Sequence, residues 1–260
     1  MTILSSLNKL NDTLIDVSDI RRRIIHKEKN SCVSSNHVIH FTRSFNNLEG
    51  ILKNGFRPSE CDEYPIFLKA YYEIEGLLEL INSKAPAIEY RKVPVICFCD
   101  LTKNTLKHHK SRYGYYGIGL SKSWAISNYL SPLFYVPKDT STHSTIYGIV
   151  NLSKRIIELK IQDDNPEVLI LIQHIYKLLD FIKPYQDPDN GQKYYDEREW
   201  RYVPNRFIDP NDPSTYLKFD NEDIEVIYVK NSLEKRQVCR ILEESGKYFN
   251  KKKIKLSRKD

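Results

Sequence analysis

The stretch that organises this chain is a run of charged and aromatic residues, Tyr194-Tyr195-Asp196-Glu197-Arg198-Glu199-Trp200-Arg201-Tyr202-Val203. Read as one β-strand, it places Glu197, Glu199 and Arg201 on the same face, and it mixes rings with charges on both faces. A half-buried structural strand would instead alternate apolar with polar residues. The run therefore predicts either a strand that lines a polar site or an edge strand whose charges discourage pairing with other chains.

The sequence around this run predicts an α+β fold with a mixed, largely antiparallel sheet and flanking helices. Strands are expected at 38–42, 93–100, 118–120, 133–137, 146–150 and 224–229. Helices are expected at 3–29, 44–55, 71–83, 167–181 and 232–249, where apolar residues recur at helical spacing, and shorter ones after Asp100 or Thr102 and after Ser121. Ser44 suits the start of the second of these helices and Gly55 its end.

Composition and length limit the class of protein. The 260 residues make one large domain or two small ones, and a hydrophobic content of 40% argues for a folded chain. We expect a helical extension over 1–36, a single α+β domain over 37–250 and a basic tail over 251–260. The tail holds much of the net charge of +6. It permits contact with nucleic acid, and we expect it to act through charge more than through packing.

No apolar run approaches 20 residues, so no membrane span is expected. The first residues lack the features of a secretory signal, which predicts a cytoplasmic protein. Five scattered cysteines form a poor disulfide framework. Cys97 and Cys99 share a strand face, but no second pair or histidine cluster completes a metal site, so we interpret them as small core residues.

Two further features suit a binding site. Three of the nine glycines fall within residues 114–119, among tyrosines and directly before a helix capped by Ser121. Glycine lets the backbone approach a ligand, although a plain turn feeding the helix would look the same. His40 stands on a strand just before a short helix, where it either faces a cleft or is structural. The polar loop 183–193 can fold over a site.

These pieces resemble known families. His40 in Ile39-His40-Phe41-Thr42, the Gly117-Ile118-Gly119-Leu120-Ser121 turn with Tyr129 downstream, and Glu197-Arg198-Glu199 resemble in order the His, Tyr and Glu motifs of ADP-ribosyltransferases, with an opening similar to DarT-type enzymes. Over 38–203 the chain resembles even more the AbiGi-like family of bacterial abortive-phage-resistance proteins, through its His-Phe-Thr, Cys-Phe-Cys-Asp, Tyr-Gly-Ile-Gly-Leu-Ser-Lys and Glu-Trp-Arg segments. That family is often described as the antitoxin or immunity side of a two-gene system.

The resemblance to the transferases implies NAD as a co-substrate, with ADP-ribose passed to an unknown acceptor or to water, and no metal. Glu199 would stabilise the cation that develops on the ribose, Glu197 would orient the acceptor, and His40 would bond a ribose hydroxyl. Residues implied in NAD binding are His40, Thr42, Tyr116, Gly117, Gly119, Ser121 and Tyr129. The tyrosine of the transferase motif normally follows the glycines in the strand, where this chain has Gly119-Leu120.

The alternative is a catalytically silent antitoxin that binds a partner protein encoded next door. A nuclease is weaker, because the sequence shows no cluster of paired carboxylates with a lysine. We expect His40 and Glu199 to face one cleft although 159 positions separate them. Side chains on opposite faces of the sheet would overturn the transferase interpretation and leave the antitoxin standing.

Overall fold

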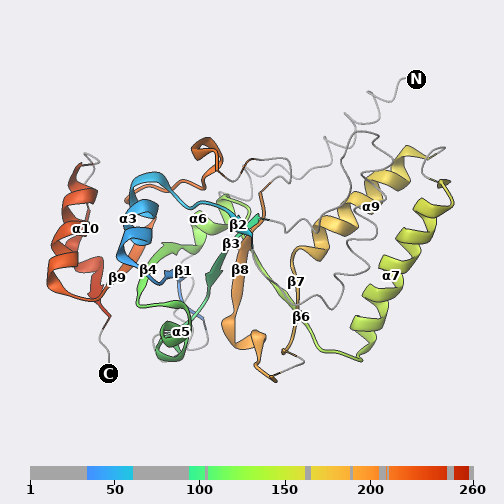
Figure 1. Cartoon of the computed structure of the whole chain (residues 1–260), viewed down its shortest axis with the longest axis horizontal. Coiled ribbons are helices and arrows are strands. Elements are labelled where there is room, and N and C mark those ends of the chain that lie inside the picture. The colour runs from blue at the N-terminus through green and yellow to red at the C-terminus, as the bar shows by residue number, and fades with distance from the viewer. Residues whose placement is uncertain are drawn as a thin grey trace.

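The computed structural model describes residues 34–60, 94–102, 105–161, 165–187, 190–204, 209, 211–244 and 249–257. The helices expected over 3–29 and 71–83 lie outside these ranges. Within them the chain forms a central sheet flanked by helices, and a separate pair of helices extends from one end of the sheet (Figure 1). The division into an extension, a domain and a tail stays a prediction.

The central sheet has eight strands in the described part of the chain, in the order β10-β9-β4-β1-β3-β8-β5, with β2 paired to β3 outside this path. The pairings are antiparallel except that of β9 with β10. The bounds are β1 His37–Thr42, β2 Ser59–Glu60, β3 Pro94–Cys99, β4 Tyr116–Ser121, β5 Ser131–Pro132, β8 Glu199–Tyr202, β9 Ile224–Val229 and β10 Ile254–Leu256. The expected mixed, largely antiparallel sheet is confirmed.

Helices cover both faces of this sheet, because its inner strands carry apolar side chains on both sides. One core gathers Leu48 of α3 (Phe45–Asn54), Trp124 of α6 (Lys122–Ser127) and Val238 of α10 (Ser232–Glu244). The other core holds Leu106 of α5 (Leu106–Tyr113) against Ile39 and the opposite strand faces. Alternation along each strand therefore assigns neighbouring residues to different cores.

The caps form largely as the sequence predicts. The Ser44 hydroxyl accepts the Asn47 N–H at 3.2 Å, and α3 ends at Gly55, whose φ is +86°. Ser121 caps α6 in the same way. The helix expected to begin at Asp100 or Thr102 starts instead at Leu106, because the Thr102 carbonyl accepts the N–H groups of Thr105 and Leu106 in a preceding turn.

Strands β1 and β3 separate over most of their length. They are paired at Ile39 and Cys99, whereas β2 pairs with the other end of β3 through Ser59 and Val95. Between these two points the described residues place no strand beside β3 on that side. The His40 ring lies there instead, with Nδ1 at 2.8 Å from the Cys97 carbonyl oxygen. The sheet is thus open along the middle of β3.

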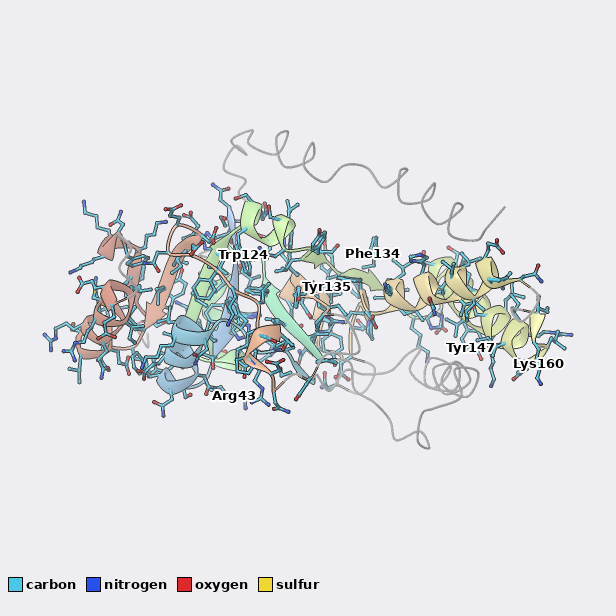
Figure 2. The ribbon with its side chains drawn as sticks, turned by 90° about the horizontal axis from the view of Figure 1, so that it is seen from above. Arg43, Trp124, Phe134, Tyr135, Tyr147 and Lys160 are labelled. Atoms are coloured by element: carbon cyan, nitrogen blue, oxygen red, sulfur yellow. The ribbon has the colours of Figure 1, made fainter. Side chains whose placement is uncertain are left out.

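A helical arm, residues 134–184, extends from the sheet (Figure 1, Figure 2). Its stem is a parallel pair, β6 (Phe134–Val136) and β7 (Ile182–Pro184), and its helices are α7 (Ser141–Glu158) and α9 (Pro166–Leu179). The expected strand at 146–150 is wrong, because these residues lie inside α7. The burial of Val150, Ser153 and Ile157 follows a helical period, and a short apolar run alone cannot distinguish helix from strand.

The charged and aromatic run at 194–203 is not one strand. Its first part is a 3₁₀ helix, Tyr194–Glu197, and Arg198 then adopts a left-handed conformation with φ +46° before β8 begins. The Arg198 carbonyl accepts the Asp100 N–H at 3.0 Å, which fixes this turn beside the end of β3. Strand β8 lies between β3 and the short β5. Of the two sequence interpretations, the strand that lines a polar site is the correct one.

The basic tail packs more than expected. After a 3₁₀ turn, Lys251–Lys253, residues 254–256 form β10 parallel to β9, and Ile254 is 1% exposed. The Ser257 N–H donates to the Val229 carbonyl at 2.6 Å. The expectation that this segment contributes little packing is therefore wrong for Ile254, which is buried in a strand that forms one edge of the sheet, whereas Leu256 is exposed.

Candidate functional site

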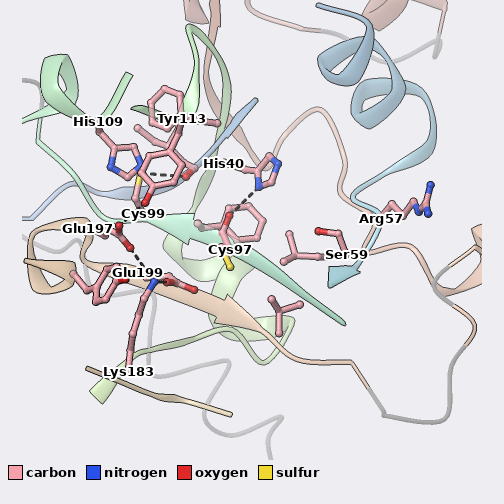
Figure 3. A pocket seen from close by; sticks show the side chains of 16 residues that line it. His40, Arg57, Ser59, Cys97, Cys99, His109, Tyr113, Lys183, Glu197 and Glu199 are labelled. Atoms are coloured by element: carbon pink, nitrogen blue, oxygen red, sulfur yellow. Dashed lines mark hydrogen bonds and ion pairs between the residues drawn. The ribbon is translucent and has the colours of Figure 1, made fainter. Parts of the chain in front are cut away.

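A pocket of about 360 Å³ opens where β1 and β3 separate (Figure 3). That volume lies at the lower end of the range for small-molecule sites. Its lining comes from β1, β2, β3, β7, β8, α5, the 3₁₀ helix at 194–197 and the segment before β2: Ile39, His40, Phe41, Arg57, Ser59, Val95, Ile96, Cys97, Phe98, Cys99, His109, Tyr113, Lys183, Tyr194, Glu197 and Glu199. The three predicted catalytic residues, His40, Glu197 and Glu199, are all among them.

Two buried carboxylates share one lysine at the inner end of the pocket. Glu197 and Glu199 are each 5% exposed. The Lys183 ammonium, on β7, donates to Glu197 Oε2 at 2.9 Å and to Glu199 Oε2 at 2.8 Å (Figure 3). Glu197 belongs to the 3₁₀ helix and Glu199 to β8, and the left-handed Arg198 between them brings their carboxylates together. The sequence prediction had both carboxylates on one face of an unbroken strand.

Glu199 is held by cations on both of its oxygens. Arg201 donates to Oε1 through Nε at 3.0 Å and through Nη2 at 2.8 Å, and its Nη1 donates to the Asp180 carbonyl. Burial alone would raise the pKa of Glu199, but Arg201 and Lys183 outweigh it and lower the pKa to about 2. The Glu199 N–H donates to the Tyr135 hydroxyl at 2.8 Å. Glu199 is therefore ionised at neutral pH and rigidly fixed.

Glu197 has a different set of partners. The Tyr113 hydroxyl of α5 donates to its Oε1, and Arg112 lies at 3.6 Å from the same oxygen. Burial, followed by this hydrogen bond, raises the pKa of Tyr113, so the hydroxyl keeps its proton. The His109 ring lies 4.4 Å from the Tyr113 ring, and burial next to Arg112 lowers the pKa of His109 to about 4. Tyr113 and His109 are therefore neutral at pH 7, and Arg112 is the charged neighbour on this side of Glu197.

His40 reaches the same pocket from the other face of the sheet. Ile39 pairs with Cys99, and Cys99 pairs with Glu199, so alternation sends the His40 side chain to the opposite face. There its ring packs edge-on against Phe56 and Phe98 of the first core. The shared pocket is as expected, but the opposite faces are the arrangement that counts against one ribose being held by both groups.

The protonation of His40 follows from its surroundings. Burial lowers its pKa, so the ring is neutral at pH 7. A carbonyl oxygen can only accept, which makes Nδ1 the donor to Cys97 and leaves Nε2 as an acceptor. An acceptor nitrogen can receive a ligand hydroxyl but cannot supply positive charge. His40 is thus equipped for a neutral hydrogen bond alone.

The other residues implied in NAD binding do not line the pocket. They lie on β1, on β4 beyond it, or past α6: Thr42, Tyr116, Gly117, Gly119, Ser121 and Tyr129. The two glycines of β4 make room within the sheet, since a Cβ on Gly119 would lie 2.6 Å from Val226 and one on Gly117 would lie 2.9 Å from Phe41. Tyr129 is 70% exposed. The structure does not bring this group to the carboxylates.

Sequence reasoning missed the residues that complete the site. Lys183 was interpreted only as the start of a polar loop, and His109 and Tyr113 had no role. Lys183 beside Glu197 and Glu199 is a paired carboxylate and lysine cluster, so the stated reason for setting a nuclease aside is wrong. The described residues contain no group of three or more histidines, cysteines or carboxylates that could hold a metal ion.

The cysteines at the pocket are partly as expected. Cys99 is buried, its thiol donates to the Ile39 carbonyl at 3.3 Å, and burial raises its pKa. Cys97 is less buried and hydrogen-bonds Glu199. Both line the pocket as well as filling space. They are small packed thiols that form one wall of the site.

Comparisons with known proteins give the chain its family. None of the described helices is both long and apolar enough to cross a membrane. No solved structure matches the chain. A relative in Lactococcus lactis subsp. cremoris, "Abortive phage resistance protein AbiGi", is 26% identical over 177 residues, which is 61% of this chain and 68% of the relative. A family described as "Putative abortive phage resistance protein AbiGi, antitoxin" matches residues 67–230, a range that includes Lys183, both carboxylates and Arg201. The chain therefore belongs to the AbiGi family of abortive phage resistance proteins.

Proposed function

We propose that this chain acts in the cytoplasm in abortive phage resistance as an antitoxin that binds a partner protein and holds NAD in the open-sheet pocket without cleaving it in the state described above. The observation that carries the proposal is that both oxygens of Glu199 are bonded by cations, Oε1 by Arg201 and Oε2 by Lys183. A carboxylate that must stabilise a developing ribose cation needs an oxygen for it. The antitoxin role follows the family's description.

NAD binding is supported by the form and chemistry of the pocket. The pocket offers the neutral acceptor of His40, buried negative charge at Glu197 and Glu199, and flat rings at Tyr113 and Tyr194. A nicotinamide ring carries positive charge and its ribose carries hydroxyls, so each group has a complement there. Thr42, Tyr116, Gly117, Gly119, Ser121 and Tyr129 lie outside the pocket lining, so the proposed NAD binding does not use them.

A second candidate is the ADP-ribosyltransferase or NAD glycohydrolase itself, with an ADP-ribosyltransferase-like fold. Two buried carboxylates at one pocket, one of them ionised down to a pH of about 2, favour it. In that function Glu199 stabilises the ribose cation, Glu197 orients the acceptor, and Lys183 leaves the pair before reaction. Because His40 and Glu199 lie on opposite faces of the sheet, this candidate requires a reaction at the carboxylates in which His40 does not hold the same ribose.

One experiment separates the two candidates. Purified protein is titrated with NAD in a thermal-shift assay, because a ligand that binds the native state raises its melting temperature. Nicotinamide release is measured in the same samples, with and without the protein encoded by the neighbouring gene. A melting shift without nicotinamide release supports the antitoxin. Steady release that disappears in Glu199→Gln supports the transferase, and the absence of any shift contradicts both.

A further inference from the structure

The pocket has two ends of opposite charge. The buried Glu197 and Glu199 stand at the inner end, whereas the exposed Arg57, between α3 and β2, and the exposed Ser59, the first residue of β2, stand at the rim (Figure 3). Ser59 pairs with Val95 on β3, and Glu199 pairs with Cys99. Four residues of an extended strand span about 13 Å, so a ligand that contacts both ends must be elongated.

The pocket has a cation at each end, and the two differ in their partners. The described residues contribute two lysine or arginine side chains to the pocket lining, Lys183 and Arg57. Lys183 forms ion pairs with both Glu197 and Glu199. Arg57 is exposed, donates to the Asn211 amide oxygen at 2.8 Å, and forms no ion pair with a described side chain. A guanidinium has five N–H donors, and among the described side chains Asn211 accepts from one of its nitrogens, so the group can present further donors to an anion.

The backbone fixes where Arg57 stands although its side chain is exposed. The preceding residue, Phe56, exchanges both backbone hydrogen bonds with Leu217 at 2.9 Å each. Two residues later, Ser59 enters the β2 pairing with β3. The neighbouring Gly55 is forced to be glycine, since a Cβ would lie 2.7 Å from the Leu217 carbonyl oxygen and φ is +86°. Arg57 is therefore carried between two anchored points at the mouth of the pocket.

We propose that Arg57, assisted by the Ser59 hydroxyl, is the subsite for the diphosphate of a dinucleotide whose ribose end enters toward the carboxylates. This inference rests on the proposed NAD binding and adds an orientation to it. A phosphate at the inner end would face two buried carboxylates, whereas at the rim it meets a guanidinium that can bond two of its oxygens at once. The charge layout thus places the diphosphate at the rim, and the positive charge of the nicotinamide ring makes the nicotinamide riboside the end that suits the buried carboxylates.

The test compares ligands with and without the diphosphate. NAD, ADP-ribose and nicotinamide riboside are titrated by calorimetry into wild type, Arg57→Ala, Arg57→Lys and the control Arg240→Ala. Arg240 is exposed on α10 and does not line the pocket. We expect Arg57→Ala to lower the affinity for NAD and for ADP-ribose about 10-fold or more and to leave the affinity for nicotinamide riboside unchanged. Arg57→Lys should restore part of the loss, because it keeps the charge but loses the planar fork.

The outcomes separate this inference from the proposed function. NAD binding that is equal in wild type and Arg57→Ala overturns the subsite and leaves NAD binding intact. An equal loss for all three ligands also overturns it, because it shows a general effect on the pocket. ADP-ribose that binds through Arg57 while NAD does not bind supports the subsite and contradicts the proposed ligand. Wild type that binds none of the three overturns both proposals.

Discussion

Removal of the shared lysine is the sharpest perturbation of the site. Lys183→Met keeps much of the side-chain volume but leaves Glu197 and Glu199 facing each other. The Lys183 ammonium lies 2.9 Å from one carboxylate oxygen and 2.8 Å from the other, so these oxygens are at most 5.7 Å apart. Two unit charges at that distance repel by about 3 kcal/mol at an effective dielectric constant of about 20. For a chain of this size we expect a melting temperature lower by roughly 6–12 °C.

The pH dependence identifies the cause. Acidification lets one carboxylate of the buried pair that has lost its lysine take up a proton, which removes the repulsion. The loss of stability in Lys183→Met should therefore be smaller at pH 5 than at pH 8. Lys177→Met is the matched control, because Lys177 is exposed on α9 and does not line the pocket. Urea denaturation of the three proteins at both pH values is the assay. A Lys183→Met deficit that is absent at pH 8, or equal at the two pH values, would refute the electrostatic argument.

Three further predictions concern the same network and the sheet. Glu199→Gln should destabilise by about 3 kcal/mol, because it removes the carboxylate from buried Arg201, whereas Glu197→Gln leaves that pair intact and should cost less; melting curves in which the order is reversed would contradict this. The free energy of unfolding should decrease as pH falls below about 6.5, because the unfolded chain binds protons that the buried His40 and His109 do not bind in the folded state. It should decrease further between about pH 4.5 and 2 as Glu199 is protonated. An unfolding free energy that is constant from pH 7.5 to 4 would be inconsistent with these lowered pKa values. Ile254→Ala should lower the melting temperature by emptying a buried position of β10. Replacing the exposed Lys252 and Lys255 by glutamine should not, although it should reduce any salt-dependent binding of nucleic acid.

Local signals were enough to predict most elements of the sheet. The apolar run at 93–100 predicts the buried β3, and Ser44 and Gly55 mark the ends of α3 because caps depend on neighbours only a few residues away. The strand prediction for 146–150 is wrong because five apolar and small residues fit the period of a strand as well as that of a helix. In the structure they form part of α7. The prediction for the tail is wrong for a related reason. The residues next to Ile254 show no apolar periodicity, and its strand forms only by pairing with β9.

The candidate site could be predicted in its carboxylates but not in their partners. Glu197 and Glu199 are conspicuous because charge on a buried strand needs a reason. Lys183 is one of many lysines, and nothing within its own loop indicates that β7 will deliver its ammonium between two glutamates. The face of His40 depends on the register between β1 and β3, which a single sequence does not contain. Register and long-range ion pairs arise only when the strands assemble.

The strength of the Lys183 pair bears directly on when the pocket could react. For Glu199 to accept a ribose cation, Lys183 must leave, and the repulsion worked out above means that this open state lies about 3 kcal/mol higher. Each 1.4 kcal/mol is a factor of ten, so fewer than about one molecule in a hundred would be open. Any ligand or partner that favours the open state must bind it about a hundredfold more tightly to populate it. Lys183 is carried by the stem of the helical arm, so a partner that moves the arm could supply this preference. Nicotinamide release by the isolated protein and by its complex with the neighbouring gene product should therefore differ most in wild type, and the difference should vanish in Lys183→Met.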